Sequence, residues 1–168
     1  MIDVTLEQPG ADARPIFENL LQLYTHDFSE FWAGRQEGEL QADGRFAPYP
    51  HLDSYWTEAE RTPYLIRADH HLAGFALINR YSHSGLPLDW AVAEFFVVRK
   101  HRRGGVGFAA ATQVIRARPG LWEMAVARKN TDALPFWRRV ASAIAGPSVE
   151  ELDCDDALWN GWILRFRA

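Results

Sequence analysis

The chain has 168 residues, of which 48% are hydrophobic and 24% are charged, and its formal net charge is −4. This length and composition predict one ordinary globular domain covering residues 1–168. The single cysteine, Cys154, excludes an internal disulfide and a thiolate metal site, and the six histidines show no HExxH spacing, so no metal site is expected.

The first ten residues, MIDVTLEQPG, contain acids and lack an apolar core. We therefore expect neither a signal peptide nor a membrane anchor in this segment. No stretch of the sequence approaches the roughly 20 apolar residues that a membrane-spanning helix needs. These observations predict a cytoplasmic protein without a membrane partner.

The first part of the chain predicts a strand followed by helices. Residues 1–7 alternate apolar and polar side chains, which is the pattern of a half-buried strand. Asp12 is the expected N-cap of a helix, and a second short helix is expected over residues 27–32. The first helix carries its apolar stripe at Ile16, Phe17, Leu20, Leu21 and Tyr24.

A long loop and two strands are expected next. Residues 34–50 are rich in glycine and proline, and loops of this length are often functional. Residues 52–60 predict a short helix. Residues 64–68 and 72–81 predict two strands joined by a tight turn. Gly74 lies inside the second of these strands and indicates a bulge.

The most informative stretch covers residues 90–120. Its first nine residues are apolar apart from Glu94, which predicts a strand buried on both faces. A cationic segment follows, and then Gly104, Gly105 and Gly107 lead directly into a helix. A glycine turn at a helix N-terminus presents bare backbone N–H groups and a positive dipole end, so this stretch predicts an anion-binding turn.

The remaining elements and the charge distribution complete the pattern. Residues 121–127 predict a strand, a helix is expected to begin at Asn130, and 149–154 and 159–166 supply two last strands. Residues 61–140 carry 13 basic and 5 acidic side chains in an otherwise acidic protein, which suits a phosphate-rich ligand. No interleaved aromatic pattern or recognised module indicates nucleic acid.

Two motifs in this order resemble the GNAT superfamily of N-acetyltransferases. The pattern RxxGxG over residues 102–107 is similar to that family's acyl-CoA pyrophosphate loop. Asn130, with Ala133 and the aromatic Trp137 behind it, is similar to the family's second motif. The resemblance covers residues 90–140. It implies an α/β (α+β) GNAT fold with one mixed, mostly antiparallel sheet of about six or seven strands, splayed between the fourth and fifth strands, with helices on both faces.

The resemblance also implies acetyl-CoA as the acyl donor. Backbone N–H groups of residues 103–107 would hold the pyrophosphate, and the backbone of residues 96–98 would run alongside the pantetheine arm. Asn130 would either cap the fourth helix or bond the pantetheine. The expected cofactor-binding set is Phe96, Val97, Val98, Arg102, Arg103, Gly104, Gly105, Val106, Gly107, Asn130 and Trp137.

Glu94 is the predicted general base, because burial raises a carboxyl pKa toward the range in which it can accept a proton from an ammonium. The alternative is that Glu94 faces water or pairs with an arginine, and Glu123 in the next strand is the second candidate. Many relatives place a tyrosine at the position of Trp137, where it can protonate the leaving thiolate. Indole is no usable acid near neutral pH, so here the sequence departs from the family pattern, and Trp137 reads equally well as a core aromatic.

The expected function is transfer of an acetyl group from acetyl-CoA to a primary amine of a small molecule or peptide by direct attack. A homodimer is left open. The first 60 residues combine acids and aromatic rings, which would suit a cationic acceptor. The side chains considered for this role are Tyr24, Asp27, Phe28, Glu30, Trp32, Tyr49, Asp53, Tyr55 and Trp56.

Two other functions remain open from the sequence. One is a non-catalytic acyl-CoA-binding protein of the same fold, because the tyrosine is missing. The other is a nicotinamide-dinucleotide-binding protein, because Gly105, Gly107 and Ala110 also satisfy a GxGxxG/A fingerprint. That fingerprint calls for an acidic residue at the end of the following strand, where this chain has Arg128 and Lys129.

Overall fold

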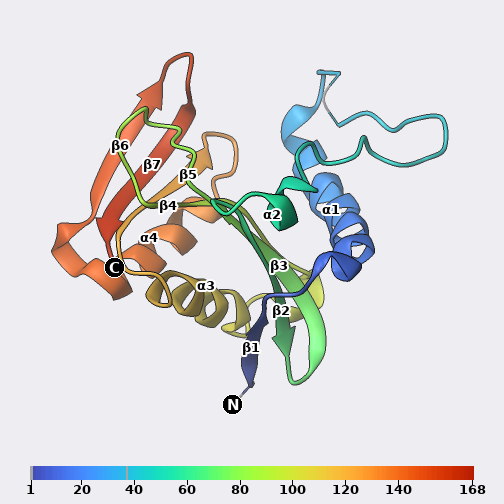
Figure 1. Ribbon diagram of the computed structural model, residues 1–168. Helices are drawn as coiled ribbons and strands as arrows, with labels where there is room; N and C mark the ends of the chain where they lie inside the picture. The colour runs from blue at the N-terminus through green and yellow to red at the C-terminus, as the bar shows by residue number, and fades with distance from the viewer. Residues whose placement is uncertain (1, 37) are drawn as a thin grey trace.

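The computed structural model describes residues 2–36 and 38–168. Met1 of the predicted first strand and Glu37 of the predicted long loop therefore lie outside the described residues. One mixed sheet has the strand order β1-β2-β3-β4-β5-β7-β6, with β4 and β5 parallel and the other described neighbours antiparallel (Figure 1). The strands are β1 (Val4–Glu7), β2 (Thr62–Ala68), β3 (His71–Asn79), β4 (Trp90–Val97), β5 (Leu121–Ala127), β6 (Glu150–Asp155) and β7 (Asn160–Arg167).

Helices cover both faces of this sheet. The α-helices are α1 (Arg14–Ser29), α2 (Ser54–Thr57), α3 (Val106–Arg116) and α4 (Ala133–Ala145). Short 3-10 turns are η1 (Ala11–Ala13), η2 (Glu30–Trp32), η3 (Arg99–His101) and η4 (Gly146–Ser148). Apolar side chains of α1 and α2 pack on one face of β2, β3 and β4, while those of α3 and α4 pack on the opposite face and reach β5 and β7. The predicted fold class is confirmed.

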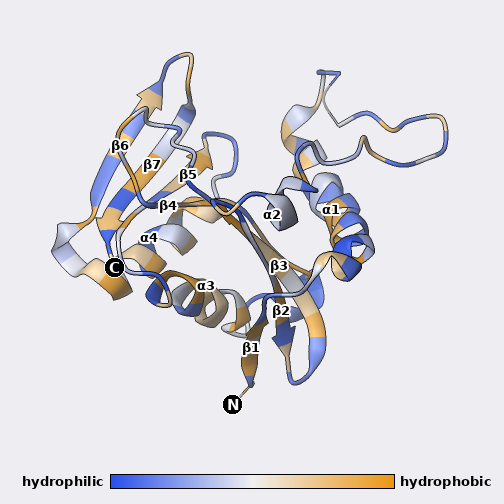
Figure 2. Cartoon of the chain, viewed as in Figure 1, coloured by the Kyte–Doolittle hydropathy of each residue, from blue (hydrophilic) through white to orange (hydrophobic). Residues whose placement is uncertain are grey.

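The residue patterns explain this layering. Figure 2 shows hydrophobic and hydrophilic residues mixed along α1 and α3, as expected for helices that bury one side only. In α1 the buried positions are Phe17, Leu20 and Leu21, and in α3 they are Val106, Ala110, Ala111, Val114 and Ile115. Each helix therefore packs its apolar stripe against the sheet.

The helix boundaries near the N-terminus differ from the predicted ones. Asp12 is not an N-cap: it lies inside η1, and α1 begins after Ala13 without a side-chain cap. Pro15 occupies the first turn of α1, where its missing N–H costs no hydrogen bond. The predicted short helix over 27–32 is the last turn of α1 followed by η2, and the helix predicted over 52–60 shrinks to the single turn of α2.

The sheet opens between β4 and β5. The two strands pair only from Trp90 to Val92, opposite Trp122 to Met124. A register shift between β3 and β4 leaves Ala93 as an extra residue, and from there to Val97 the edge of β4 that faces β5 has no strand partner. The predicted splay is confirmed, and it exposes a row of backbone polar groups beside β4.

Burial of β4 follows from this opening. Ala91, Phe96 and Val97 are buried, whereas residues 92–95 are only partly covered. The prediction of a strand buried on both faces is therefore wrong for its middle, because β5 turns away there. Gly74 in β3 lies where an added Cβ would be 1.9 Å from the carbonyl oxygen of Phe96, next to a register shift with β2, so the predicted bulge and close backbone approach are confirmed.

Three further observations bear on the predictions. Among the described strands only β4 and β5 pair in parallel, so the sheet is not the doubly wound parallel sheet that the dinucleotide alternative would need. Residues 38–50 form a long loop that projects beyond α1 (Figure 1), as predicted for the described part of 34–50. Among the described residues, no helix has the length and apolar character needed to cross a bilayer.

Candidate functional site

The glycine turn before α3, which the sequence predicts to bind an anion, leaves several backbone N–H groups without a protein acceptor. Gly105 is the N-cap of α3 and adopts a left-handed conformation with φ 89°. The N–H groups of residues 103–105 have no protein acceptor in the described chain, and those of Val106 and Gly107 lie in the first helical turn, where no intrahelical acceptor exists. A Cβ added to Gly105 would meet nothing within 4 Å, so the turn is open to a ligand.

A cleft of about 530 Å³ lies along the splayed part of β4 and reaches Arg102, which precedes the glycine turn. Its lining comes from the C-terminal half of α1, from η2, from β4 and the turn after it, and from the residues just before α4. The lining residues are Tyr24, Asp27, Phe28, Glu30, Phe31, Phe95, Phe96, Val97, Arg99, Arg102, Asn130, Thr131 and Asp132. This cleft brings the predicted residues Phe96, Val97, Arg102 and Asn130 together.

Asp27 ties the end of α1 to the turn after β4. Its carboxylate accepts a hydrogen bond from Arg99 at 2.9 Å and another from Arg102. Burial alone would raise the pKa of Asp27, but these two guanidinium groups hold it below its usual value. Arg102 also donates from Nε to the carbonyl oxygen of Val97 at 2.6 Å. Across the cleft, Lys129 donates from Nζ to the carbonyl oxygen of Phe31 at 3.1 Å. The segment that includes Asp27 and Phe31 is therefore fastened on both sides of the cleft.

Glu94 projects from the splayed part of β4 toward α1, and two phenols hold its carboxylate. Tyr24 of α1 donates its hydroxyl hydrogen to Oε2, and Tyr49 of the long loop donates to Oε1 at 3.1 Å. Burial raises the pKa of Glu94, and the two hydroxyl hydrogen bonds offset part of that rise. Burial and the neighbouring carboxylate also raise the pKa values of both tyrosines, so these phenols stay protonated.

Asn130 and Trp137 lie in different environments. Asn130 lines the cleft, and its side chain makes no hydrogen bond to the described protein. The predicted capping role is not observed, because α4 begins without a side-chain cap. Trp137 is 8% exposed and packs edge-on against Phe95 with ring centroids 5.3 Å apart. Since Phe95 separates Trp137 from the cleft, the core interpretation describes its position.

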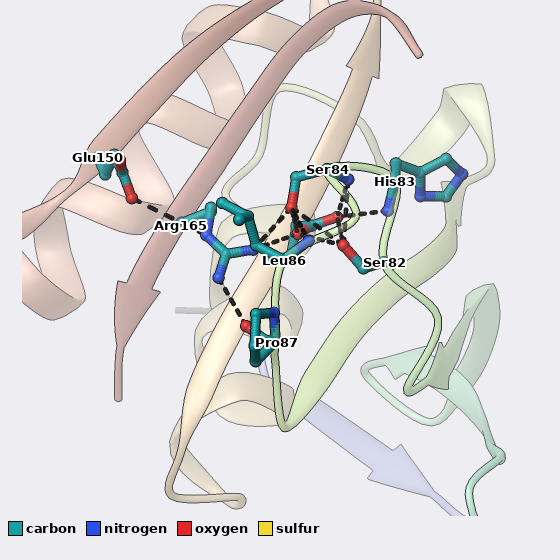
Figure 3. A network of polar contacts seen from close by, with 8 residues as sticks. Ser82, His83, Ser84, Leu86, Pro87, Glu150 and Arg165 are labelled. Atoms are coloured by element: carbon teal, nitrogen blue, oxygen red, sulfur yellow. Dashed lines mark hydrogen bonds and ion pairs between the residues drawn. The ribbon is translucent and has the colours of Figure 1, made fainter. Parts of the chain in front are cut away.

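Glu123, the second candidate base, belongs to a buried polar network (Figure 3). Its Oε2 accepts a hydrogen bond from Arg165 at 2.5 Å, and further donors are the hydroxyls of Ser82 and Ser84 and the backbone N–H of His83. Burial alone would raise the pKa of Glu123, but the hydrogen bonds from residues 82–84 hold it below its ordinary value. A carboxylate with so many donors is a weak base, and we assign it a structural role.

Of the side chains considered for a cationic acceptor, four line the cleft: Tyr24, Asp27, Phe28 and Glu30. Tyr55 is 2% exposed and belongs to the core, and Asp53 pairs with Arg14 on the surface. Sequence reasoning did not connect Tyr24 and Tyr49 with Glu94, or Asp27 with the arginines after β4, because no local pattern links positions 45 to 75 residues apart. Within residues 2–36 and 38–168, no group of three or more His, Cys, Asp or Glu side chains gathers that could hold a metal ion.

Comparisons with solved structures show the fold. An acetyltransferase from Thermus thermophilus aligns with a TM-score of 0.65 at 12% identity, over 98% of this chain and 97% of the other. A spermidine N-acetyltransferase from Vibrio cholerae in complex with CoA and spermine aligns with a TM-score of 0.58 at 11% identity, over 98% and 95%. An aminoglycoside acetyltransferase from an uncultured soil metagenomic sample aligns with a TM-score of 0.61 at 15% identity, over 91% and 93%.

A comparison with curated protein sequences finds no match. The family model described as the acetyltransferase (GNAT) family matches residues 17–141, a span that runs from α1 through the splayed strands and the glycine turn into α4. This match covers most of the chain and every element that builds the cleft. The chain therefore belongs to the GNAT family of acetyltransferases.

Proposed function

We propose that the protein is an N-acetyltransferase that moves an acetyl group from acetyl-CoA to a primary amine of a small molecule or peptide by direct attack. The observation that carries this proposal is a path along β4. The N–H groups of residues 103–107, which have no acceptor in the described protein, follow the open edge of β4, and Glu94, whose pKa is raised, lies on the same strand. That path offers an anion site, a groove for an extended arm and a base.

The dimensions of this path suit the donor. From Val98 back to Glu94 the strand advances four residues, which is about 13 Å. This length is comparable to an extended pantetheine arm. The pyrophosphate would therefore lie on the glycine turn, the arm would bond the backbone of Phe96 to Val98 as an added strand would, and the thioester would reach the level of Glu94. The side chain of Asn130, which makes no hydrogen bond to the described protein, lines the same cleft and would bond the arm.

The chemistry requires a neutral amine at the thioester carbonyl. An ammonium loses a proton to Glu94, its nitrogen attacks the carbonyl carbon, and a backbone N–H on the open edge of β4 stabilises the oxyanion. The carbon–sulfur bond then breaks and its electron pair leaves with sulfur. The raised pKa of Glu94 suits this base role, because its carboxylate binds a proton more readily than an exposed carboxylate does.

A cationic acceptor is supported by the lining of the cleft. Glu30 and Asp132 are exposed acids that line it, and the rings of Phe28 and Phe31 line the same cleft. Carboxylates and ring faces both attract ammonium groups. Two structures of similar fold have names that specify spermidine and aminoglycosides, compounds that carry several amines, so an acceptor with more than one amine is the first class to assay.

Replacing Gly105 with glutamate is expected to abolish acetyl-CoA binding. The side chain would point into open space at the turn, place a negative charge where phosphate belongs, and strain a backbone with φ 89°. Gly44→Glu is the matched control, because Gly44 has φ 78° and equally open surroundings in the distant loop. Isothermal titration should show saturable binding for the wild type and Gly44→Glu only. Equal binding by both variants would overturn the proposed site.

Replacing Asp27 with asparagine is expected to tighten acetyl-CoA binding about threefold at low salt. The variant leaves Arg99 and Arg102 without the carboxylate that neutralises them beside the anion turn. The gain should shrink as salt rises, since both guanidinium groups are partly exposed. Glu30→Gln removes the same charge from the same cleft without breaking an observed ion pair. If titration shows that acetyl-CoA affinity rises equally in the two variants, the ion pairs of Asp27 with the two arginines do not affect acetyl-CoA binding.

The second candidate, a non-catalytic acyl-CoA binder, rests on the position of Trp137 behind Phe95. It predicts saturable acetyl-CoA binding with no release of thiol from any amine. A panel of polyamines, aminoglycosides and peptide amines, scored by coenzyme A release, separates the two functions. Release that depends on one class of amine supports the enzyme, and its absence across the panel favours the binder.

A further inference from the structure

Tyr24 occupies a position between the base and the cleft. Its ring lines the cleft together with Phe95, Phe96 and Val97, and it packs edge-on against Phe96 with ring centroids 6.0 Å apart. Its hydroxyl hydrogen is donated to Oε2 of Glu94. One phenol oxygen therefore touches the carboxylate while the same side chain borders the space beside the open strand edge.

A proton donor assists the departure of the coenzyme A sulfur, and neither Trp137 nor Asp27 can supply that proton. Trp137 lies on the other side of Phe95, and an indole N–H is no acid near neutral pH. Asp27 is held ionised by Arg99 and Arg102, and an ionised carboxylate has no proton to give. Among the side chains that line the cleft, Tyr24 is the one whose hydroxyl is linked by a hydrogen bond to the proposed base.

We propose that Tyr24 is a second catalytic residue that passes the proton taken by Glu94 on to the coenzyme A sulfur. This inference rests on the proposed acetyl transfer. The first proton of the acceptor ammonium passes through Glu94 to water before attack, which returns Glu94 to its carboxylate. The second nitrogen proton moves to Glu94 as the carbon–nitrogen bond forms. As the carbon–sulfur bond breaks, the Tyr24 hydroxyl gives its proton to sulfur, and the phenol oxygen takes the proton from Oε2 of Glu94. Both side chains end in their starting states, and the thiol leaves neutral.

The relay also accounts for a phenol of raised pKa acting as an acid. While Glu94 is ionised, burial and then the charge of Glu94 raise the pKa of Tyr24, so the phenol holds its proton. Once Glu94 has accepted the acceptor's proton, that charge is gone and the phenol can be reprotonated as it donates. The acid therefore becomes competent only after the base has acted, which matches the order of the chemical steps.

Tyr49 provides an internal comparison. It bonds the other oxygen of the same carboxylate, but its ring lines a separate pocket formed by α1 and the long loop. A tyrosine whose only function is to hold Glu94 in place should therefore behave like Tyr49. Replacing a tyrosine that donates a proton to sulfur should instead lower the rate of acetyl transfer by a factor that depends on the leaving group, unlike replacement of Tyr49.

The test compares Tyr24→Phe, Tyr49→Phe and Glu94→Gln with two donors, an alkyl thioester and an aryl thioester of acetate. Aryl thiolates leave without a proton, because the aryl thiol is much the stronger acid. We expect Tyr24→Phe to lower acetyl transfer from acetyl-CoA and from ethyl thioacetate about 100-fold, and to lower transfer from phenyl thioacetate less than about fivefold. Glu94→Gln should be equally impaired with both simple thioesters, and Tyr49→Phe should lose less than about tenfold with either.

The outcomes separate this inference from the proposed function. If wild-type protein turns over acetyl-CoA but Tyr24→Phe is impaired equally with both thioesters, or no more than Tyr49→Phe, Tyr24 only positions Glu94 and the relay is overturned. If the wild type binds acetyl-CoA and releases no thiol with any amine, the proposed transfer fails and the relay fails with it. Unchanged acetyl-CoA affinity in Tyr24→Phe, measured by titration, shows that the cleft is intact.

Discussion

Replacing Glu94 with glutamine is expected to lower kcat for acetyl transfer by about 10²- to 10⁴-fold, the range typical of a lost general base. The amide keeps the shape of the side chain and can still accept hydrogen bonds from Tyr24 and Tyr49 through its oxygen, but it cannot take a proton from an ammonium. Acetyl-CoA affinity should stay within about twofold of the wild type, because the donor is held by backbone groups of the glycine turn and β4.

The control for this variant is Glu30→Gln. Glu30 is an exposed carboxylate in the same cleft, so its replacement removes an equal charge without touching the base. Steady-state rates with the best amine from the panel should separate the two variants by at least tenfold in kcat. A Glu94→Gln enzyme with near wild-type kcat would remove the general-base role from the mechanism.

The dependence of kcat on pH should reflect the ionisation of Glu94. Only ionised Glu94 can act as a base, and because burial raises its pKa, the acid limb of kcat should fall at a pH above the ordinary glutamate value of 4.5. Tyr49 donates a hydrogen bond that lowers this pKa. Tyr49→Phe should therefore move the acid limb to higher pH, and a shift to lower pH would contradict the assignment.

The sequence predicted those parts of the site that depend on neighbours in the chain. The glycine turn, the helix after it and the strand before it follow from local residue types within residues 90–120, and the structure places them as expected. The splay between β4 and β5 came from the family resemblance and not from periodicity. The strand pattern around Glu94 could not show that β5 turns away after Met124.

Contacts between distant segments were beyond sequence reasoning. Glu94 lies 70 residues from Tyr24 and 45 from Tyr49, and Asp27 lies 75 residues from Arg102. These partners depend on how the end of α1 and the long loop cross the open sheet, which no local propensity specifies. The prediction for Glu123 was limited in the same way, because its neighbours in the sequence are apolar like those of Glu94. Its hydrogen-bond partners in the fold lower its pKa, whereas the pKa of Glu94 is raised.

The largest stability effect is expected at this second carboxylate. Replacing Glu123 with leucine should lower the free energy of unfolding by about 3–5 kcal/mol, the usual cost of leaving the other member of a buried ion pair without its partner. Glu123 is 1% exposed and Arg165 is 5% exposed, and their side chains meet at 2.5 Å. For a chain of this length, such a loss corresponds to a fall of about 10 °C in Tm.

Two further variants isolate the ion pair. Glu150 lies 3.9 Å from Arg165 but its side chain is 62% exposed, so Glu150→Gln should cost less than about 1 kcal/mol (Figure 3). The double replacement Glu123→Leu with Arg165→Leu removes both charges and should recover part of the loss. Recovery should be incomplete, because Ser82, His83 and Ser84 also donate to Glu123 and fix the loop between β3 and β4.

The pH dependence of this loss has a defined sign. Because the hydrogen bonds from residues 82–84 outweigh burial and hold the pKa of Glu123 below its ordinary value, its ionised form stabilises the folded chain. That contribution is fully present above the unfolded glutamate pKa of about 4.3 and disappears as the pH falls through the lower folded value. Chemical unfolding at pH 7 and pH 3.5 should therefore show a smaller gap between wild type and Glu123→Leu at the lower pH. A gap that is constant with pH, or no larger than that of Glu150→Gln, would mean that the buried carboxylate does not stabilise the fold through its charge.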